Sequence, residues 1–344
     1  FLRVFALDGS LLERPCIDSI AAIRQVTRLF KKVELPCSSA RQKAAYERYV
    51  TNDEECQEDL QVDPIRISLV AGHLWSCLET LSDRIYLSHG VFGNGATAER
   101  LGKNARLSVK SWPVRGEEYF PLTQHCLSRE DDLDTIQTID LLEVDRELPV
   151  RVVSVPKTLK TPRIISVEPS HMMLRQQQVA RVLMDFLEND HKFRGSIRFS
   201  DQTVNRDRAR LGSIDGGLAT IDLSDASDRV SNALVKHIFE VAPTFLGFAQ
   251  AARSNTAKVP GHGVKVLRKY ASQGSALCFP IEAMVFYTIV VASILHYRGE
   301  SPTTKRIADI SAKVSVYGDD IIVPSETAEA VMSALELYGL KVNK

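Results

Sequence analysis

The segment VSVYGDDIIV, near the C-terminal end of the sequence, constrains the fold more than any other stretch. Two runs rich in β-branched residues, 314–317 and 321–323, flank Gly318-Asp319-Asp320, an order typical of a β-hairpin with a tight turn. Gly318 allows the backbone conformations that such a turn requires. Because adjacent carboxylates repel each other unless a cation lies between them, Asp319 and Asp320 are candidate ligands of Mg²⁺, which prefers oxygen donors. Ordinary turn chemistry also explains this tripeptide, so the metal-binding interpretation needs support from other segments.

The charged residues are segregated along the chain. The sequence has 344 residues, 44% hydrophobic and 25% charged, enough for a large core or for two to three subdomains. The formal net charge is zero, yet residues 130–147 carry eight acids and one base, and residues 151–163 carry four bases and no acid. No acid occurs between Glu240 and Glu282. This pattern favours a protein that binds a polyanion in a groove, although a solvated helix face explains any single block.

Cysteine usage and apolar runs favour a cytosolic protein. The cysteines, at positions 16, 37, 56, 77, 126 and 278, form no Cys-x-x-Cys pair, so neither a zinc ribbon nor a disulfide framework is indicated. No signal peptide is visible, and the most apolar run, 276–295, contains Pro280 and Glu282, which favours a buried helix over a membrane span. From the residues at its two ends, Phe1 and Lys344, we expect an internal piece of a longer polypeptide.

The N-terminal part of the sequence predicts helices and a glycine-rich turn. Apolar spacing indicates helices within 1–60 and over 69–87, and the acidic stretch 130–147 predicts a surface helix. Residues 92–99, FGNGATAE, predict a glycine-rich turn that leads into a helix, with Thr97 as its candidate cap. Such a turn can present backbone N–H groups to phosphate, and it is equally typical of a plain loop.

A basic connection between two strands is a candidate phosphate-binding element. Residues 150–155 and 164–167 predict strands, and the proline-bounded connection between them carries Lys157, Lys160 and Arg163. Arginine offers a planar fork and lysine a movable charge, a combination that can hold a triphosphate. A solvated basic hairpin is the alternative interpretation.

A helix and a second basic stretch follow. Apolar spacing predicts a helix over 171–187 that leaves Gln176, Gln177 and Gln178 partly exposed. Residues 191–210 carry six Lys or Arg and two Asp, with two phenylalanines, 193 and 199, interleaved. Basic side chains with aromatic ones can follow a single strand of nucleic acid and stack on its bases.

A second strand is predicted to deliver a carboxylate. Residues 218–223 read as a strand that contains Asp222 near its end, and a helix is predicted over about 227–241. If this strand pairs with the hairpin, Asp222 comes close to both hairpin acids, and three acids at neighbouring strand ends can hold two metal ions. Asp228 can accept a hydrogen bond from a ribose 2′-hydroxyl. The alternative role for Asp225 and Asp228 is capping of the following helix.

The remaining segments predict loops, a helix and a final strand. Residues 261–263 predict a loop within a β-hairpin, and residues 271–277 a Ser/Gly loop that can contact a template or a sugar, or serve as a linker. A helix over 326–338 is predicted to end at Gly339, and residues 340–342 predict a strand.

Three of these motifs, in this order, resemble motifs A, B and C of viral RNA-dependent RNA polymerases. They are DLSDASD at 222–228, SQGSA at 272–276 and YGDD at 317–320. The closer resemblance is to the replicases of the positive-strand RNA bacteriophages, the leviviruses and their relatives. VPKTLKTPRII at 155–165 resembles their basic motif F, and YGLKVNK at 338–344 resembles the start of motif D. The glycine-rich segment resembles an N-terminal family motif that usually has proline where Asn94 stands.

The resemblance implies an α+β right-hand polymerase fold whose palm is an antiparallel sheet backed by helices. It assigns residues 1–150 to the N-terminal region and fingers, 151–215 to fingers with motif F, and 216–344 to the palm. A fingers insertion is expected at about 242–270. The thumb is expected to be missing from this chain.

The resemblance also implies roles for individual residues. Two Mg²⁺ ions, for which Mn²⁺ could substitute, would be held by Asp222, Asp319 and Asp320. Nucleotide binding would involve Lys157, Lys160, Arg163, Asp228, Ser272 and Gly274. Either Lys341 or Lys344 would act as general acid toward pyrophosphate. Many such polymerases have asparagine where Glu282 stands; phage replicases have an acid there, which leaves open how Asp228 is oriented.

The implied function is template-directed RNA synthesis by two-metal nucleotidyl transfer from an NTP to an RNA 3′-hydroxyl, for phage genome replication. The implied partners are template and product RNA, NTPs, and bacterial translation factors with a ribosomal protein, in the cytoplasm of the infected host and without a membrane. The alternatives are a polymerase of the capsidless narnavirus and mitovirus lineages and a non-catalytic RNA-binding fragment with a polymerase fold. A reverse transcriptase would need an aromatic residue just after Asp222, and residues 226–228 are Ala-Ser-Asp.

Overall fold

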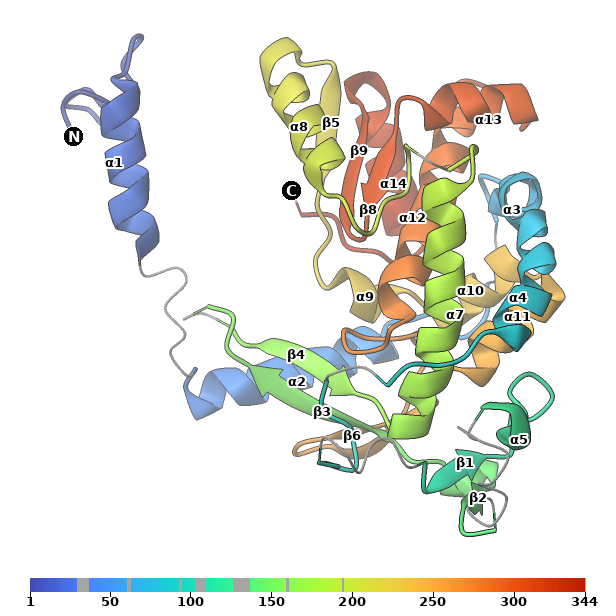
Figure 1. Cartoon of the computed structure of the whole chain (residues 1–344). Coiled ribbons are helices and arrows are strands. Elements are labelled where there is room, and N and C mark those ends of the chain that lie inside the picture. Colours follow the sequence, from blue (N-terminus) through green and yellow to red (C-terminus); the bar gives the residue numbers. More distant parts are fainter. Residues whose placement is uncertain are drawn as a thin grey trace.

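The protein is a mixed assembly of helices and three sheets (Figure 1). The computed structural model describes residues 1–29, 37–60, 63–92, 95–102, 109–125, 137–158, 161–193 and 195–343. Lys160 and Lys344 lie outside the described residues, as do Gly93 and Asn94 of the glycine-rich turn. The helix α1 (Ile17–Arg28) has no buried residue, and Figure 1 shows it apart from the other elements.

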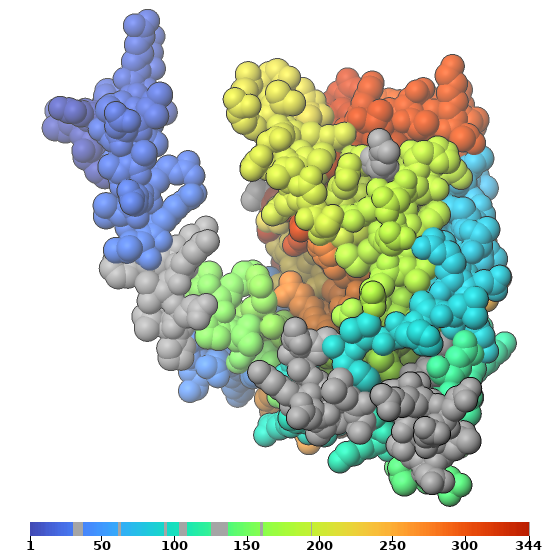
Figure 2. All heavy atoms as spheres, in the orientation of Figure 1, coloured from blue at the N-terminus to red at the C-terminus, as the bar shows by residue number. Residues whose placement is uncertain are grey.

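A three-stranded antiparallel sheet contains the C-terminal hairpin. Its order is β5 (Leu218–Ile221), β9 (Asp320–Pro324) and β8 (Ser315–Tyr317). Tyr317 pairs with Asp320, so two residues form the hairpin loop, and Ile221 pairs with Ile321 in the neighbouring strand. The predicted hairpin is confirmed, and the strand before Asp222 pairs with it, which meets the condition for bringing Asp222 close to the hairpin acids. The helix α8 (Thr203–Asp215) packs against all three strands, and Figure 2 shows it at the surface of the molecule.

The helix α12 (Cys278–Tyr297) forms the centre of the main core. Its apolar residues face every side, and α14 (Ala328–Leu337), α3 (Ile67–Trp75) and α10 (Asn232–Phe239) pack around it. Among the described residues it is the one helix long and apolar enough to cross a membrane, but 94% of its apolar window is buried within the molecule. A helix that is apolar all round and enclosed by other helices is typical of a large core, as the sequence predicted.

A four-stranded sheet joins two hairpins that are far apart in sequence. The hairpin of β3 (Val150–Val155) and β4 (Arg163–Val167) matches the predicted strands. It pairs in parallel, through β3, with the hairpin of β6 (Thr256–Val259) and β7 (Gly263–Val266). The helix α2 (Ser39–Glu54) packs on this sheet, where the Tyr46 hydroxyl accepts a hydrogen bond from the Ser154 N–H at 3.0 Å.

The remaining elements complete the two cores. Further helices are α4 (Ser82–Leu87), α5 (Leu122–His125), α7 (Ser170–Asn189), α9 (Ala226–Arg229), α11 (Pro243–Ala251) and α13 (Thr304–Ser311). Short 3₁₀ segments are η2 (Ser76–Leu81), η5 (Val144–Arg146) and η6 (Ser325–Thr327), and β1 (Ser111–Pro113) pairs with β2 (Asp140–Leu142). The predicted helices over 69–87, 171–187 and 326–338 are confirmed within these elements.

Two predictions about secondary structure are wrong. Within the predicted acidic helix 130–147, residues 137–147 hold a short strand and a 3₁₀ turn, and residues 130–136 lie outside the described residues. No helix begins in residues 95–102; instead the buried Thr97 hydroxyl accepts a hydrogen bond from the Leu101 N–H at 3.2 Å. The Glu99 carboxylate accepts hydrogen bonds from the N–H (3.0 Å) and hydroxyl (2.8 Å) of Ser170 and so completes the start of α7. This part of the glycine-rich segment therefore has a structural role.

Two predictions about exposure are also wrong. Gln176 and Gln178 are buried, because their side-chain amides donate hydrogen bonds to the carbonyl oxygens of Ala252 and Ile85. Phe193 and Phe199 are buried as well, and Phe193 stacks on Trp75 with 5.0 Å between ring centroids. These two rings belong to the core, so they cannot stack on the bases of a bound nucleic acid.

Candidate active site

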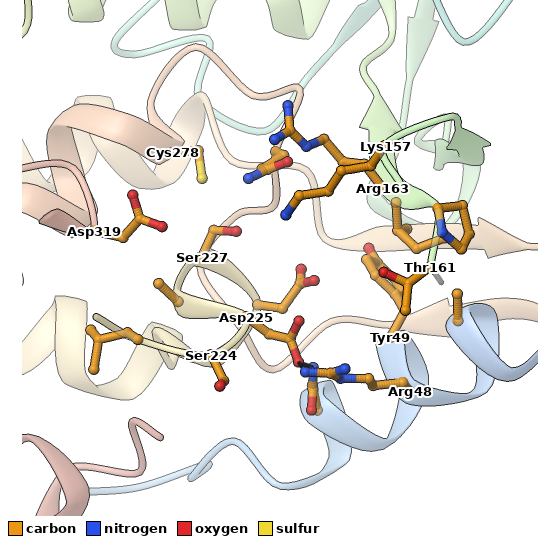
Figure 3. A pocket seen from close by; sticks show the side chains of 18 of the residues that line it. Arg48, Tyr49, Lys157, Thr161, Arg163, Ser224, Asp225, Ser227, Cys278 and Asp319 are labelled. Carbon is orange, nitrogen blue, oxygen red and sulfur yellow. Dashed lines mark hydrogen bonds and ion pairs between the residues drawn. The ribbon is translucent and has the colours of Figure 1, made fainter. Parts of the chain in front are cut away.

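A cavity of about 740 Å³ lies where the two larger sheets approach each other. Its lining comes from α2, the β3–β4 hairpin, the segment after β5, the loop before α12, α12 itself and the hairpin turn. Figure 3 shows Lys157 and Arg163 on one side of this cleft, Asp319 on another, and Arg48 with Asp225 on a third. The cleft therefore brings together most of the segments that the motifs singled out.

Three carboxylates lie at one edge of the three-stranded sheet, and we call Asp222, Asp319 and Asp320 the sheet-edge acids. Asp222 follows directly after β5, and the pairing of β5 with β9 brings it beside the hairpin turn. Asp222 and Asp319 line the cleft, whereas Asp320 lines a second cavity of about 720 Å³ that Asp222 also borders. Asp319 belongs to the two-residue loop, whereas Asp320 is the first residue of β9, and the two side chains line different cavities. Asp222 therefore lies between the two cavities.

The sheet-edge acids concentrate negative charge. Partial burial, together with Asp320 and Asp222, raises the pKa of Asp319 above its ordinary value. Within the described ranges, no Lys or Arg forms an ion pair with any of the three. Their hydrogen-bond donors are amides: Asn343 donates to Asp222 at 2.7 Å and Gln202 to Asp320 at 3.0 Å.

This donor set fits a divalent cation by its chemistry. Carboxylate oxygens are the ligands that Mg²⁺ prefers, and a cation would relieve the repulsion that raises the pKa of Asp319. In the part of the chain that the structure describes, no three carboxylate, histidine or cysteine side chains already form a metal cluster. A cation would thus have to draw the carboxylates of Asp222 and Asp319 together.

The turn that carries Asp319 has room for glycine alone. Gly318 has a φ of 59°, in the left-handed region. A Cβ atom at this position would lie 2.0 Å from the ring of Phe279, which itself packs edge-on against Tyr317 with 5.3 Å between centroids. Phe279, at the start of α12, therefore packs against the turn and fixes the position of the Asp319 backbone.

The basic residues of the β3–β4 hairpin face the acids across the cleft. Lys157 and Arg163 are exposed and line the cavity, and the charge of Lys157 partly opposes the rise in the pKa of Asp319. Thr158 and Thr161 bond to each other across the hairpin connection, with 3.3 Å between the Thr158 N–H and the Thr161 carbonyl oxygen. Lys157 and Arg163, two of the predicted nucleotide-binding residues, therefore line the same cleft as Asp319.

The loop before α12 packs closely on β4. Gly274 has a φ of 121°, and a Cβ atom there would lie 2.0 Å from the Ser166 carbonyl oxygen. The Ser166 N–H donates to the Gln273 carbonyl oxygen at 2.8 Å. Ser272 is buried, and its hydroxyl lies 3.3 Å from the Tyr49 hydroxyl. Gly274 therefore lines the cleft together with Gln273 and Ser275, while Ser272 lies behind the wall.

Sequence reasoning missed the contribution of α2. Arg41, Arg48, Tyr49 and Asn52 all line the cleft, although no chemistry was assigned to residues 1–60. Residues 41 and 48 are two helical turns apart, so they share a face, and this spacing was the available signal. Without knowledge of tertiary contacts, that signal cannot be distinguished from an ordinary solvated face.

The segment after β5 is fixed by α2 rather than by helix capping. Asp225 has left-handed backbone geometry and no capping bond; its carboxylate accepts hydrogen bonds from Arg48 Nε at 2.5 Å and Asn52 Nδ2 at 3.0 Å. The predicted helix over about 227–241 is broken into α9 and α10, and Ser231 caps α10 by accepting from the Leu234 N–H at 3.1 Å. The capping role considered for Asp225 is therefore wrong.

A buried acid, Glu282, lines the same cleft. Burial, Asp319 and Asp228 together raise its pKa well above the ordinary value, which favours the neutral form. Lys341 is exposed, and its carbonyl oxygen accepts a hydrogen bond from the Ser224 N–H at 2.8 Å. Lys341 does not line the cleft, whereas Asn343 does.

Comparison with solved structures defines the class of fold. The structure is similar to the crystal structure of the insertion loop deletion mutant of the RNA-dependent RNA polymerase of a human picobirnavirus, with a TM-score of 0.56 and 13% sequence identity. The similarity covers 95% of this chain and 65% of that chain. At this identity the match shows the fold alone, which is that of a viral RNA-dependent RNA polymerase.

Comparison of sequences identifies the family. Because residues 32–344 match the family of the RNA replicase beta-chain, the chain belongs to that family. It is 36% identical to the RNA-directed RNA polymerase beta chain of Escherichia phage MS2 over 192 residues, which are 56% of this chain and 32% of that protein. It is 29% identical to the RNA-directed RNA polymerase subunit beta of Escherichia virus Qbeta over 267 residues, which are 75% of this chain and 40% of that protein.

These matches confirm the predicted resemblance to phage replicases. The matched regions span less than half the length of either relative. None of the matches favours the capsidless lineages over the phage proteins.

Proposed function

We propose that this chain carries the catalytic centre of an RNA-directed RNA polymerase, which copies an RNA template by nucleotidyl transfer. In this reaction the 3′-hydroxyl of the growing RNA attacks the α-phosphorus of an NTP, and pyrophosphate leaves. The observation that supports the proposal most is a single cleft lined by Asp222 and Asp319 on one side and by Lys157 and Arg163 on the other. Acids that can hold a cation, facing bases that can hold a triphosphate, are what this reaction needs.

The sheet-edge acids would hold two Mg²⁺ ions, with Mn²⁺ as a substitute. When bound, such ions favour the ionised form of an attacking hydroxyl and neutralise charge on a departing oxygen. Lys157 and Arg163 would orient the triphosphate so that the α-phosphorus lies in line with the attacking oxygen. Two roles remain predictions. They are triphosphate binding by Lys160, on the same connection, and proton donation to pyrophosphate by Lys341 or Lys344.

Asp228 would read the sugar of the incoming nucleotide. Its carboxylate lies in the cleft wall and can accept a hydrogen bond from a 2′-hydroxyl, the group that distinguishes RNA from DNA. The loop with Gly274 would form the adjacent wall, with Ser272 behind it. In this proposal residues 1–150 supply the N-terminal region and fingers, residues 151–215 supply fingers with the basic hairpin, and residues 216–344 form the palm, with a fingers insertion at about 242–270.

The proposed partners follow from the reaction and from the family. RNA template, RNA product and NTPs would occupy the cleft and its approaches. The relatives are phage proteins, so the site of action would be the cytoplasm of an infected bacterium, where translation factors and a ribosomal protein of the host are candidate partners.

The test is template-directed incorporation of labelled ribonucleotides by the protein at its full natural length, with Mg²⁺ and a bacterial extract. Asp319→Asn should abolish incorporation, and Asp309→Asn, an exposed acid on α13, should not. Equal incorporation by wild type and Asp319→Asn would overturn the proposal. If wild type, Asp319→Asn and Asp309→Asn all fail to incorporate ribonucleotides but still bind RNA, the result would support the alternative of a non-catalytic RNA-binding protein.

A binding measurement supplements the activity assay. Ligands that bind only the folded state raise its stability, so Mg²⁺ should raise the melting temperature of the wild-type protein. The same increase should be absent from Asp319→Asn and present in Asp309→Asn. An equal increase in all three proteins would place the cation elsewhere.

A further inference from the structure

Lys269 is a fully buried lysine that lies beside the cleft and has no role in the proposed reaction. Its side chain has no exposed surface, although an ammonium group is costly to remove from water. Its Nζ atom lies 3.1 Å from Oδ1 of Asp228 and 3.4 Å from the centre of the Tyr49 ring. It also donates to the Tyr49 carbonyl oxygen at 3.4 Å. A buried ion pair with this many partners holds its members in one geometry.

The backbone around Lys269 is held as firmly as its side chain. The Lys269 N–H donates to Asp53 Oδ1 at 3.0 Å, and the Arg268 N–H lies 3.2 Å from the same carboxylate. Asp53 and Tyr49 belong to α2, one turn apart, so a single helix fixes both ends of the lysine. Burial alone would lower the pKa of Lys269, but Asp228, Tyr49 and Asp53 raise it above its ordinary value. The ammonium group therefore stays charged.

Asp228 has one carboxylate oxygen occupied and the other without a protein donor. Oδ1 accepts the hydrogen bond from Lys269, and across the described part of the chain no donor bonds Oδ2. Its side chain retains 17% of its exposure and lines the cleft. A carboxylate that is anchored through one oxygen keeps the other available to a ligand hydroxyl.

We propose that Lys269 is a positioning residue that determines the preference of the site for ribose over 2′-deoxyribose. The ion pair fixes the carboxylate of Asp228 so that Oδ2 can accept the 2′-hydroxyl of the incoming nucleotide. The Tyr49 ring confines the ammonium from its other side through a cation–π contact. This inference rests on the proposed function, because Asp228 must face the nucleotide sugar for Lys269 to matter.

The nearby pair of Arg48 and Asp225 does not offer the same rigidity. Its side chains retain 55% and 29% of their exposure, against 0% and 17% for Lys269 and Asp228. Exposed ion pairs are mobile and weak, whereas a buried pair fixes geometry. We therefore assign the positioning role to Lys269 rather than to Arg48.

The experiment compares kcat/KM for ATP and for 2′-deoxy-ATP in the full-length protein with Mg²⁺. Lys269→Met should reduce the ratio of the two values about tenfold, as loss of a hydrogen bond to a charged group implies. Asp228→Asn should reduce it at least as much, and the double variant should show no further loss. Lys265→Met, on β7 with its Nζ 3.7 Å from Glu54 in a half-exposed pair, is the matched control and should keep the wild-type ratio.

The outcomes separate this inference from the proposed function. A wild-type protein that incorporates neither nucleotide would contradict the proposed function itself. Wild-type discrimination with equal losses for both nucleotides in Lys269→Met would mean that Lys269 only supports the fold, and would overturn the inference. If Lys269→Met fails to fold, Lys269→Arg retains the charge but displaces the carboxylate with its larger fork. Its ratio should fall severalfold, and an unchanged ratio would overturn the inference.

Discussion

The cleft contains two groups of carboxylates that the protein treats in opposite ways. Asp225 and Asp228, in the segment after β5, each pair with a cation of the chain itself, Arg48 and Lys269. The sheet-edge acids have no such partner among the described residues and accept hydrogen bonds only from amide groups. A paired acid has its charge balanced within the chain, whereas an unpaired acid keeps a charge that a cation from solution can satisfy. Pairing thus separates residues suited to position a ligand from residues suited to bind metal.

The difference has a local structural origin. The segment after β5 passes along α2, whose Arg48 and Asn52 side chains donate to the carboxylate of Asp225. The hairpin turn instead projects from the sheet against Phe279, an apolar neighbour that cannot neutralise charge. Two carboxylate groups that line one cleft therefore experience different electrostatic environments.

The strongest test of this comparison is to replace one acid of each group by asparagine. Asp222→Asn removes a charge that the proposed cations need, and we expect kcat to fall by about a thousandfold or more. Asp225→Asn removes a charge that is paired with the half-exposed Arg48, and we expect a loss of less than about tenfold. Single-turnover incorporation by both variants measures the difference. Similar losses would mean that pairing does not distinguish the two groups.

The position of the hairpin turn is the next feature to perturb. Gly318→Ala places a Cβ atom 2.0 Å from the Phe279 ring and strains a φ of 59°, so we expect stability to fall by about 2 kcal/mol. Because the turn must shift, incorporation should fall by about a hundredfold. Gly263→Ala, with a φ of 73° and open space around it, is the control for strain alone.

The control Gly263→Ala should lose stability in urea unfolding while keeping its incorporation activity. Full activity in Gly318→Ala would show that the position of Asp319 tolerates a moved turn.

A substitution in the basic β3–β4 hairpin is expected to have a smaller effect on incorporation. Lys157→Met removes one charge that faces the triphosphate, and we expect KM for NTPs to rise about tenfold with a smaller change in kcat. Lys258→Met, an exposed lysine on β6, should leave both constants unchanged. A fall in kcat alone for Lys157→Met would mean that the lysine acts on the transition state rather than on binding.

Much of the site could be predicted because its signals are local. The C-terminal hairpin and the basic β3–β4 hairpin follow from β-branched runs, turn residues and proline boundaries. The central helix could be predicted as buried because its apolar residues face every side. Each of these patterns depends on residues within one short segment.

The parts that were missed depend on contacts between distant segments. The role of α2 requires knowledge that Tyr49 and Lys269 meet, although 220 positions separate them. Gln176 looks solvent-facing in sequence, but it is buried because it donates to the Ala252 carbonyl oxygen, 76 positions away. Phe193 likewise looked available to bases because the arginines and lysines around it concealed its place in the core.

The smallest effect is expected at Glu282, which is buried beside the two groups and whose raised pKa favours the neutral form. Its folded pKa is raised well above the value of 4.5 that holds in the unfolded chain, so the unfolded state loses its proton first and stability falls as pH rises above that value. Glu282→Gln cannot titrate, so the variant should lack this fall and should gain stability relative to wild type as pH rises above 4.5 in urea unfolding. Incorporation should stay within about threefold of wild type, since a neutral amide replaces a neutral acid of similar shape. A loss as large as that of Asp222→Asn would mean that Glu282 is ionised in the working enzyme and belongs with the metal-binding group.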